Sequence, residues 1–191
     1  MRNFLCFLIC TASAWASGMS PIRTWCEQWT DGYVLLLLDE SCSMAGNRWE
    51  EGCRQVQEAM DAIPQGPGAG HWGIKLACFG DTVSIAWDEW EPVSADLKKR
   101  AATWLQADTG RGESTNLWPA LRIATDTHPK KDVPVLVVIL TDGELAAPDA
   151  NACDTLLRGE WQDGDKALML IQIDPSSENS LQVTGFTSRF G

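Results

Sequence analysis

Two apolar runs in the chain are short, uninterrupted and followed by an acid. Val34–Leu38 comes directly before Asp39, and the stretch VPVLVVIL, residues 133–140, ends just before Thr141 and Asp142. Runs of this kind are typical of strands buried on both faces of a parallel sheet, and Ala167–Asp174 predicts a further strand. Ligands of open α/β sheets bind at the carboxyl ends of the strands, so these acids mark the place where a site is expected.

Helical spacing appears between the predicted strands. The apolar stripes consist of Trp49, Cys53, Val56, Met60 and Ile63 in a first helix, Leu97, Ala101, Trp104 and Leu105 in a second, and Leu117, Leu121 and Ala124 in a third. Pro64 ends the first helix, Ser94 offers an N-cap to the second, and Pro119 falls in the first turn of the third, where proline is tolerated. Residues 149–161 predict a short fourth helix.

The alternation of strands and helices predicts the fold class. WGIKLACFG, residues 72–80, and TVSIAWDEW, residues 82–90, read as two strands of a hairpin, which places one antiparallel strand at the edge of the sheet. The rest predicts an α/β fold with a doubly wound, mostly parallel, Rossmann-like central sheet and helices on both faces. We expect one domain over residues 32–191, after a lead-in over 17–31.

Charge narrows the range of partners. The chain has 191 residues, 45% of them hydrophobic, and a formal net charge of -11. Such an acidic protein lacks the basic surface that neutralises phosphates, so nucleic acid is not an expected partner. The longest apolar runs are too short to cross a bilayer as a helix, and we expect no stable transmembrane span.

The N-terminus admits two interpretations. Residues 1–16 contain an early cation, an apolar core from Phe4 to Cys10 and the small-residue motif Ala14-Trp15-Ala16, which together are typical of a signal peptide cleaved after Ala16. Alternatively, these residues are an extension of a cytosolic protein whose functional start is Met19. The pattern slightly favours export to a secreted or periplasmic location.

The cysteines form neither a disulfide framework nor a zinc motif. Removal of residues 1–16 would leave an odd number without a CxxC spacing: Cys26, Cys42, Cys53, Cys78 and Cys153. The patterns around Cys53 and Cys78 indicate small buried hydrophobic residues.

Three polar loops follow the elements described above. They are Asp39-Glu40-Ser41-Cys42-Ser43, Ser114-Thr115-Asn116, and Thr141-Asp142-Gly143-Glu144. As a set they resemble the metal-ion-dependent adhesion site of von Willebrand factor type A domains, in which a D-x-S-x-S loop, a threonine and an aspartate hold one divalent cation above the sheet. The resemblance extends over about Gly32 to Asp174 and includes the order of motifs and elements.

The resemblance implies five metal ligands and a mode of partner binding. The family positions correspond to Asp39, Ser41, Ser43, Thr115 and Asp142. Carboxylates and hydroxyls are hard oxygen donors, which suit Mg²⁺, Mn²⁺ or Ca²⁺ rather than zinc or copper. A site of this type leaves a coordination position for an acidic side chain of a protein partner. We therefore expect a non-catalytic, adhesion-type binding module.

Each ligand candidate also has an ordinary structural explanation when it is taken alone. Ser41 and Ser43 would serve as loop or helix-capping hydroxyls, Asp39 would cap the helix that contains Trp49, and Thr115 would cap the helix that begins at Leu117. Asp142 with Gly143 would form a simple turn. The metal site is favoured because, if the five residues had separate structural roles, their positions at strand ends that meet would be a coincidence.

Two other functions compete with the adhesion module. A serine hydrolase would need a base for Ser41 or Ser43, and the only histidines, His71 and His128, belong to no catalytic motif. The family resemblance also allows an accessory subunit of an AAA+ ATPase or a chelatase-like assembly.

The C-terminus departs from the family pattern. Only residues 175–191 follow Asp174, too few for the helix, strand and closing helix that usually complete the domain. SLQVTGF, residues 180–186, could supply a short edge strand. We therefore expect an uncovered sheet edge or face, through which the protein could associate with a partner or a second copy.

Overall fold

The computed structural model describes residues 8–11, 21–65, 70–107, 112–127, 133–143, 151–153, 155–156 and 166–173. Its strands are β1 (Leu8–Thr11), β2 (Asp31–Asp39), β3 (His71–Phe79), β4 (Val83–Ile85), β5 (Glu91–Pro92), β6 (Val135–Thr141) and β7 (Lys166–Gln172). Its helices are α1 (Pro21–Cys26), α2 (Asn47–Ala62), α3 (Ala95–Ala107) and α4 (Trp118–Asp126), with a 3-10 turn η2 (Cys42–Met44). The predicted α/β class is confirmed.

The described strands form one mixed sheet in the order β1-β7-β6-β2-β3-β4, and β5 also pairs with β3. β2 pairs in parallel with both β3 and β6, whereas β4 and β5 run antiparallel to β3. After β2 the chain adds strands on one side, and it then returns to add β6 and β7 on the other. The strand order therefore reverses between β2 and β6, which is where a ligand site is expected.

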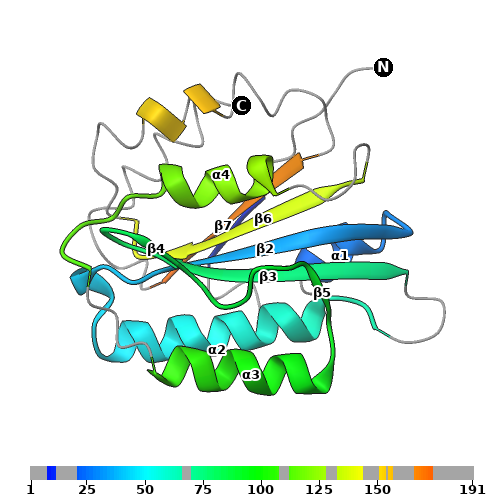
Figure 1. The fold of residues 1–191 in the computed structure, drawn as a ribbon, viewed down its shortest axis with the longest axis horizontal. Coiled ribbons are helices and arrows are strands. Elements are labelled where there is room, and N and C mark those ends of the chain that lie inside the picture. Colours follow the sequence, from blue (N-terminus) through cyan, green and yellow to red (C-terminus); the bar gives the residue numbers. More distant parts are fainter. Residues whose placement is uncertain are drawn as a thin grey trace.

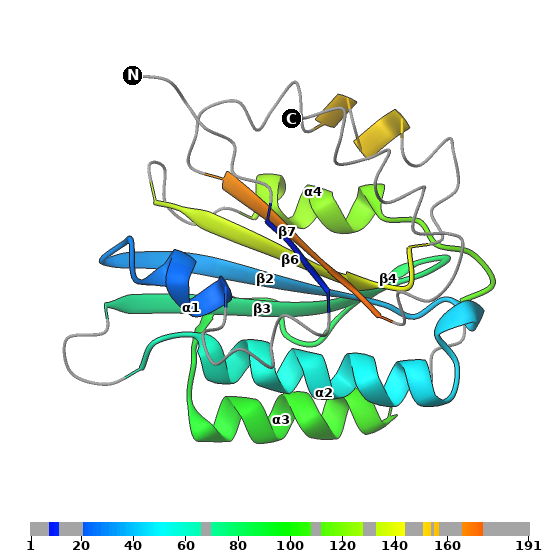
Figure 2. The ribbon, with the colours of Figure 1, turned by 180° about the vertical axis from the view of Figure 1, so that it is seen from behind.

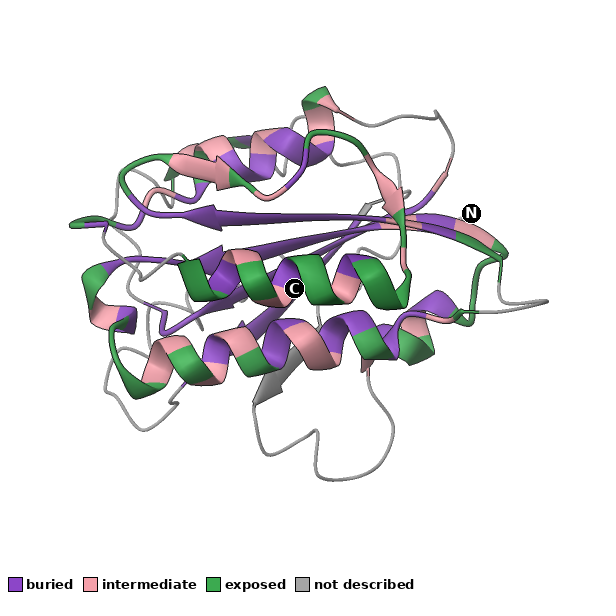
Figure 3. Cartoon of the chain, turned by 60° about the horizontal axis from the view of Figure 1, so that its bottom comes forward, coloured by how far each residue is buried: buried purple, intermediate pink, exposed green. Residues whose placement is uncertain are grey.

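Helices cover both faces of the sheet, as predicted. Figure 1 shows α2 and α3 on one face and α4 on the other. Along β2, Leu36 and Leu38 pack in the core beneath α2 and α3, whereas Leu35 and Leu37 pack in the core beneath α4. Figure 3 shows the consequence: the central strands are buried along their length, and α2 and α3 alternate between buried and exposed positions. This double burial explains why the strands read as uninterrupted apolar runs.

Local signals account for the helix boundaries. The Ser94 hydroxyl accepts a hydrogen bond from the Leu97 amide at 3.1 Å, which confirms the predicted N-cap of α3. α2 ends at Ala62 shortly before Pro64, and α4 begins with a proline in its first turn. In the predicted helix over 149–161, residues 151–153 and 155–156 are helical. No helix in the described part of the chain is long and apolar enough to cross a membrane.

The second hairpin strand is shorter than the sequence predicted. Residues 82–90 were expected to form one strand, but β4 covers only Val83–Ile85 and the next pairing with β3 is β5. The chain leaves the ladder because Trp87 turns into the core, where its indole nitrogen donates to the Ile74 carbonyl at 3.0 Å. Burial of this large ring with its polar group satisfied outweighs continued strand pairing.

The edge beyond β7 carries a strand. β1 pairs in parallel with β7, from Leu8 opposite Met169 to Thr11 opposite Gln172. Figure 2 shows β1 alongside β7, seen from behind. The backbone of this edge is therefore paired while residues 8–11 are present, and cleavage after Ala16 would uncover it. Cleavage and association through this edge stay predictions, and residues 180–186 lie outside the described part of the chain.

Candidate functional site

The carboxyl ends of β2 and β6 are level, but the acids that follow the two apolar runs are one residue out of step. Leu38 is level with Leu140, so the next residue of β2, Asp39, lies beside Thr141 and not beside Asp142. The two strand ends therefore correspond, and Thr141, not Asp142, is the neighbour of Asp39 in the sheet. Asp142 is the first residue after β6.

Asp39 is fully buried at the centre of this edge. Its two carboxylate oxygens accept a hydrogen bond from the Thr141 hydroxyl at 2.6 Å and one from the Ser41 amide at 2.9 Å. Burial, and to a smaller extent the nearby charge of Asp142, raise the pKa of Asp39, and the bonds from Thr141 and Ser41 lower it; the net value is about 6. Without a cation, the ionised form of Asp39 is therefore disfavoured in the folded protein.

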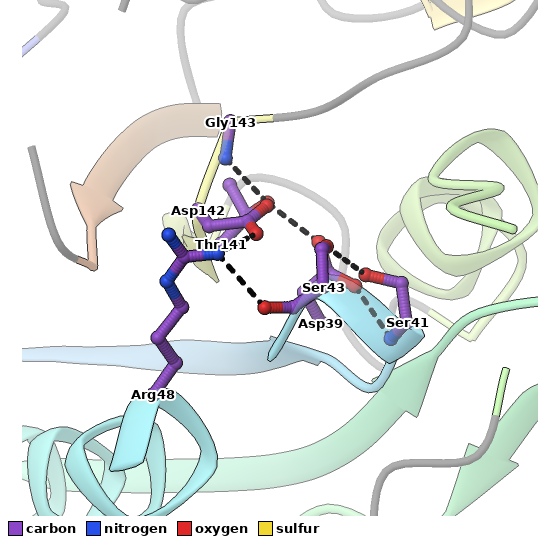
Figure 4. Close-up of polar contacts among 7 residues, drawn as sticks. All are labelled: Asp39, Ser41, Ser43, Arg48, Thr141, Asp142 and Gly143. Atoms are coloured by element: carbon purple, nitrogen blue, oxygen red, sulfur yellow. Dashed lines mark hydrogen bonds and ion pairs between the residues drawn. The ribbon is translucent and has the colours of Figure 1, made fainter. Parts of the chain in front are cut away.

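The two serines place their hydroxyl groups side by side. Ser41 and Ser43 oxygens are 3.0 Å apart, and the loop that contains them turns through η2 directly after β2. Figure 4 shows both side chains on the same side of the loop as the carboxylate of Asp39. The hydroxyls thus share one small region with a buried acid, as the D-x-S-x-S spacing predicted.

The loop that contains Thr115 is tied to the serine loop by backbone hydrogen bonds. The Cys42 amide donates to the Gly112 carbonyl at 2.7 Å, and the Gly112 amide donates to the Glu40 carbonyl at 3.0 Å. Thr115 itself is mostly buried. No hydrogen bond between described residues joins its side chain to the other four predicted ligands, so the structure brings the loops together without a direct contact from Thr115.

Asp142 is buried and forms an ion pair with Arg48, a residue to which the sequence analysis gave no role. The Arg48 Nη1 atom donates to Asp142 Oδ2 at 3.2 Å and to the Ser43 carbonyl at 2.9 Å. Arg48 belongs to the first turn of α2, where the helix dipole favours acids. An arginine in that position is unfavourable unless an acid lies nearby, so Arg48 could have indicated its ion pair from the sequence.

Thr141 is the second residue that the sequence analysis overlooked. Its hydroxyl donates to Asp39 and accepts a hydrogen bond from the Gly143 amide at 3.0 Å. It therefore fixes the orientation of Asp39 and the turn that contains Asp142. In the sequence, Thr141 is recognisable only as a hydroxyl residue at the end of an apolar strand. That it lies beside Asp39 follows from the register of β2 and β6.

The structure removes the helix-capping explanations. The N-caps of α2, η2 and α4 are Gly46, Ser41 and Leu117, and none of them makes a side-chain capping bond. Asp39 does not cap α2, and Thr115 does not occupy the cap of α4. Helix capping therefore does not explain the polar side chains at this edge.

The residues fit a hard divalent cation. Among the described residues no group of three or more His, Cys, Asp or Glu side chains could hold a metal ion, so any site here must use hydroxyls as well as carboxylates. Asp39 and Asp142 are both buried, and each negative charge disfavours the other. A small ion with oxygen ligands would offset these charges at the point where they meet.

Comparison with known proteins identifies the family of this fold. The family model for the von Willebrand factor type A domain matches residues 32–183. The chain belongs to this family. No curated protein matches the sequence. The three loops of the sequence resembled this family, and the match over residues 32–183 confirms the type A assignment.

Solved structures share the type A fold at low sequence identity. BatB from Bacteroides thetaiotaomicron has a TM-score of 0.55 at 17% identity, covering 74% of this chain and 66% of BatB. Proximal thread matrix protein 1 from the mussel byssus, solved with a zinc-occupied MIDAS motif, has a TM-score of 0.58 at 14% identity, covering 84% and 46%. Manganese-loaded TRAP from Plasmodium vivax has a TM-score of 0.59 at 15% identity, covering 81% and 62%. The chain spans less than two thirds of each of these proteins.

The type A fold places His71 far from the serines. His71 pairs with Asp31 at the amino end of β2, whereas Asp39 pairs with Phe79 at the carboxyl end. Eight residues of strand separate the two ends, or about 26 Å at about 3.3 Å per residue. His71 therefore cannot act as a base for Ser41 or Ser43, and His128 lies outside the described residues.

Proposed function

We propose that this type A domain is a metal-ion-dependent, non-catalytic protein-binding module. Asp39, Ser41, Ser43, Thr115 and Asp142 hold one divalent cation, Mg²⁺ or alternatively Mn²⁺ or Ca²⁺, and the cation captures a carboxylate of a protein partner. The observation that carries the proposal is the cluster at the sheet switch point, where buried Asp39, Asp142 and Ser41 and half-buried Ser43 lie together and make no side-chain capping bond.

The balance of charge in this ligand set explains how a partner would be captured. Two carboxylates neutralise a divalent charge, and three neutral hydroxyls fill further positions without reducing the affinity of the ion for another anion. Mg²⁺ prefers about six oxygen ligands in octahedral geometry, so five side chains leave room for one from outside. An aspartate or glutamate of the partner supplies such an oxygen.

Two proteins of the same fold were solved with a divalent cation bound. Proximal thread matrix protein 1 was solved with zinc in its MIDAS motif, and the TRAP protein was solved loaded with manganese. These observations concern those proteins. They favour a divalent cation in this chain because it shares their fold, and because its D-x-S-x-S loop, threonine and aspartate resemble the metal-ion-dependent adhesion site of the family.

Replacing Thr115 by alanine is expected to weaken binding of a captured partner at least tenfold, or about 1.4 kcal/mol, while the fold persists. The substitution removes a neutral ligand and leaves the net charge unchanged. Partners captured in Mg²⁺ and released by EDTA would be identified by mass spectrometry, and their affinity for both forms measured in each buffer.

Thr103→Ala is the matched control for this experiment. The Thr103 hydroxyl is exposed on α3 and donates only along its own helix, to the Lys99 carbonyl. The control should bind the partner as tightly as the wild type does. Equal affinity of the wild type and Thr115→Ala for the partner in Mg²⁺ would show that recognition does not depend on Thr115 as a ligand of the cation.

A further inference from the structure

The Arg48 guanidinium lies inside the candidate metal site. It extends from the first turn of α2, and its Nη1 atom bridges the Ser43 carbonyl at 2.9 Å and Asp142 Oδ2 at 3.2 Å. The Asp142 side chain is 2% exposed, whereas that of Arg48 is 32% exposed. Figure 4 shows the guanidinium directed at the point where the β2 and β6 loops meet.

This position makes the guanidinium and a divalent ion competitors. A buried carboxylate requires a compensating charge, and Arg48 supplies one to Asp142. An Mg²⁺ ion bound directly to Asp142 would lie about 2.1 Å from a carboxylate oxygen, close to the guanidinium that now donates to this group. Two positive charges at that separation repel strongly in a partly buried site.

We propose that Arg48 is an internal counter-ion that holds Asp142 in the metal-free protein and must release it when the divalent ion binds. The inference rests on the proposed function, because it assigns the cation to this same site. Arg48 then has two opposite effects: it stabilises the metal-free fold, and it lowers the affinity for the ion. The site is then half occupied at a higher free concentration of the cation than the ligand set alone would require.

A purely structural role for Arg48 makes a different prediction. If the bond to the Ser43 carbonyl served only to shape the D-x-S-x-S loop, loss of Arg48 would disorder the ligands and weaken both the fold and metal binding. Competition predicts that the two quantities change in opposite directions. The sign of the change in metal affinity therefore separates the two roles.

Arg48→Gln is the direct test. Calorimetric titration of EDTA-stripped protein with MnCl₂ is expected to show at least tenfold tighter binding in the variant, and its melting temperature in EDTA is expected to fall. Arg54→Gln is the matched control, because Arg54 is an exposed residue of the same helix and pairs with the half-buried acids Glu51 and Glu58, away from the site. It removes the same charge away from the site and should leave Mn²⁺ affinity within about twofold of the wild type.

A second measurement on the wild type covers the case in which Arg48→Gln fails to fold. The Arg48 Nε–H resonance, assigned by its loss in Arg48→Lys, is expected to shift during titration with diamagnetic MgCl₂ as the guanidinium leaves Asp142. An unchanged resonance at saturating Mg²⁺ would overturn the proposal, as would equal or weaker Mn²⁺ binding by Arg48→Gln.

The outcomes distinguish this inference from the proposed function. If the wild type binds Mn²⁺ and Arg48→Gln binds no tighter, only the role of Arg48 is wrong. If neither protein binds Mn²⁺, both proposals fail. If Arg48→Gln alone binds, competition by Arg48 is supported, and the native chain does not work as a metal-dependent module.

Discussion

Replacing Asp39 by asparagine is expected to abolish stabilisation by Mg²⁺ and, in EDTA at pH 8, to make the protein more stable than the wild type. The Asp39 pKa is about 6 in the folded protein, against 3.8 for an unperturbed aspartate, chiefly because of burial. This difference corresponds to about 3 kcal/mol that the charged form costs the metal-free fold. Asparagine has nearly the same shape and no charge.

The same pKa shift gives a pH dependence for the metal-free wild type. Between about pH 4 and pH 6 the folded state binds more protons at Asp39 than the unfolded state does, so the stability from this group falls as the pH rises through that window. Asp39→Asn should lack this loss. Urea unfolding in EDTA at pH 4.5 and pH 8 measures the difference between the two proteins.

Asp31→Asn provides the control for the charge itself. Asp31 is the first residue of β2, at the opposite end of the strand from Asp39, and it is only half-buried. The control should retain the response to Mg²⁺. A rise in melting temperature with Mg²⁺ as large in Asp39→Asn as in the wild type would show that the ion does not bind at Asp39.

Replacing Gly70 by alanine is expected to lower the free energy of unfolding by at least about 3 kcal/mol. Gly70 has φ +77°, and a Cβ atom there would lie 1.7 Å from the Thr30 carbonyl oxygen. The contact is with backbone at the start of the β2–β3 pairing, where Asp31 meets His71. A side chain can therefore fit only if the central strands move apart.

Gly46→Ala separates this clash from the cost of the backbone conformation. Gly46 has φ +72°, but a Cβ atom there would meet nothing within 4 Å. Its substitution should cost about 1–3 kcal/mol, the range for a residue held in an unfavourable conformation. Urea unfolding measures the free energy of unfolding of both variants. If both lose the same amount, the clash of a Cβ atom at Gly70 with the Thr30 carbonyl adds no cost.

Much of the site could be predicted because its parts are local in sequence. The run Val34–Leu38 identifies a buried strand, and a loop that follows such a strand lies at the edge where ligands bind. The same reasoning places Asp142. Two neighbouring strand ends therefore meet, and this prediction requires no knowledge of exact register.

The parts that were missed depend on register and on contacts between distant elements. Thr141 lies beside Asp39 because β2 and β6 pair with a particular offset, which neither strand's own sequence reveals. Arg48 reaches Asp142 only after α2 has packed against the sheet. The apolar segment within residues 1–16 has the pattern of both a signal peptide and a strand, so its pairing with β7 could not be predicted locally.

Calorimetric titration of the EDTA-stripped wild type with MgCl₂ and MnCl₂ measures whether this domain binds a divalent cation. We expect saturable binding of one ion, lost in Asp39→Asn, and a gain in stability of about 2.7 kcal/mol when the free ion exceeds its dissociation constant a hundredfold. Absence of saturable binding, with a melting temperature unchanged by Mg²⁺, Mn²⁺ or Ca²⁺, would contradict the metal-dependent function.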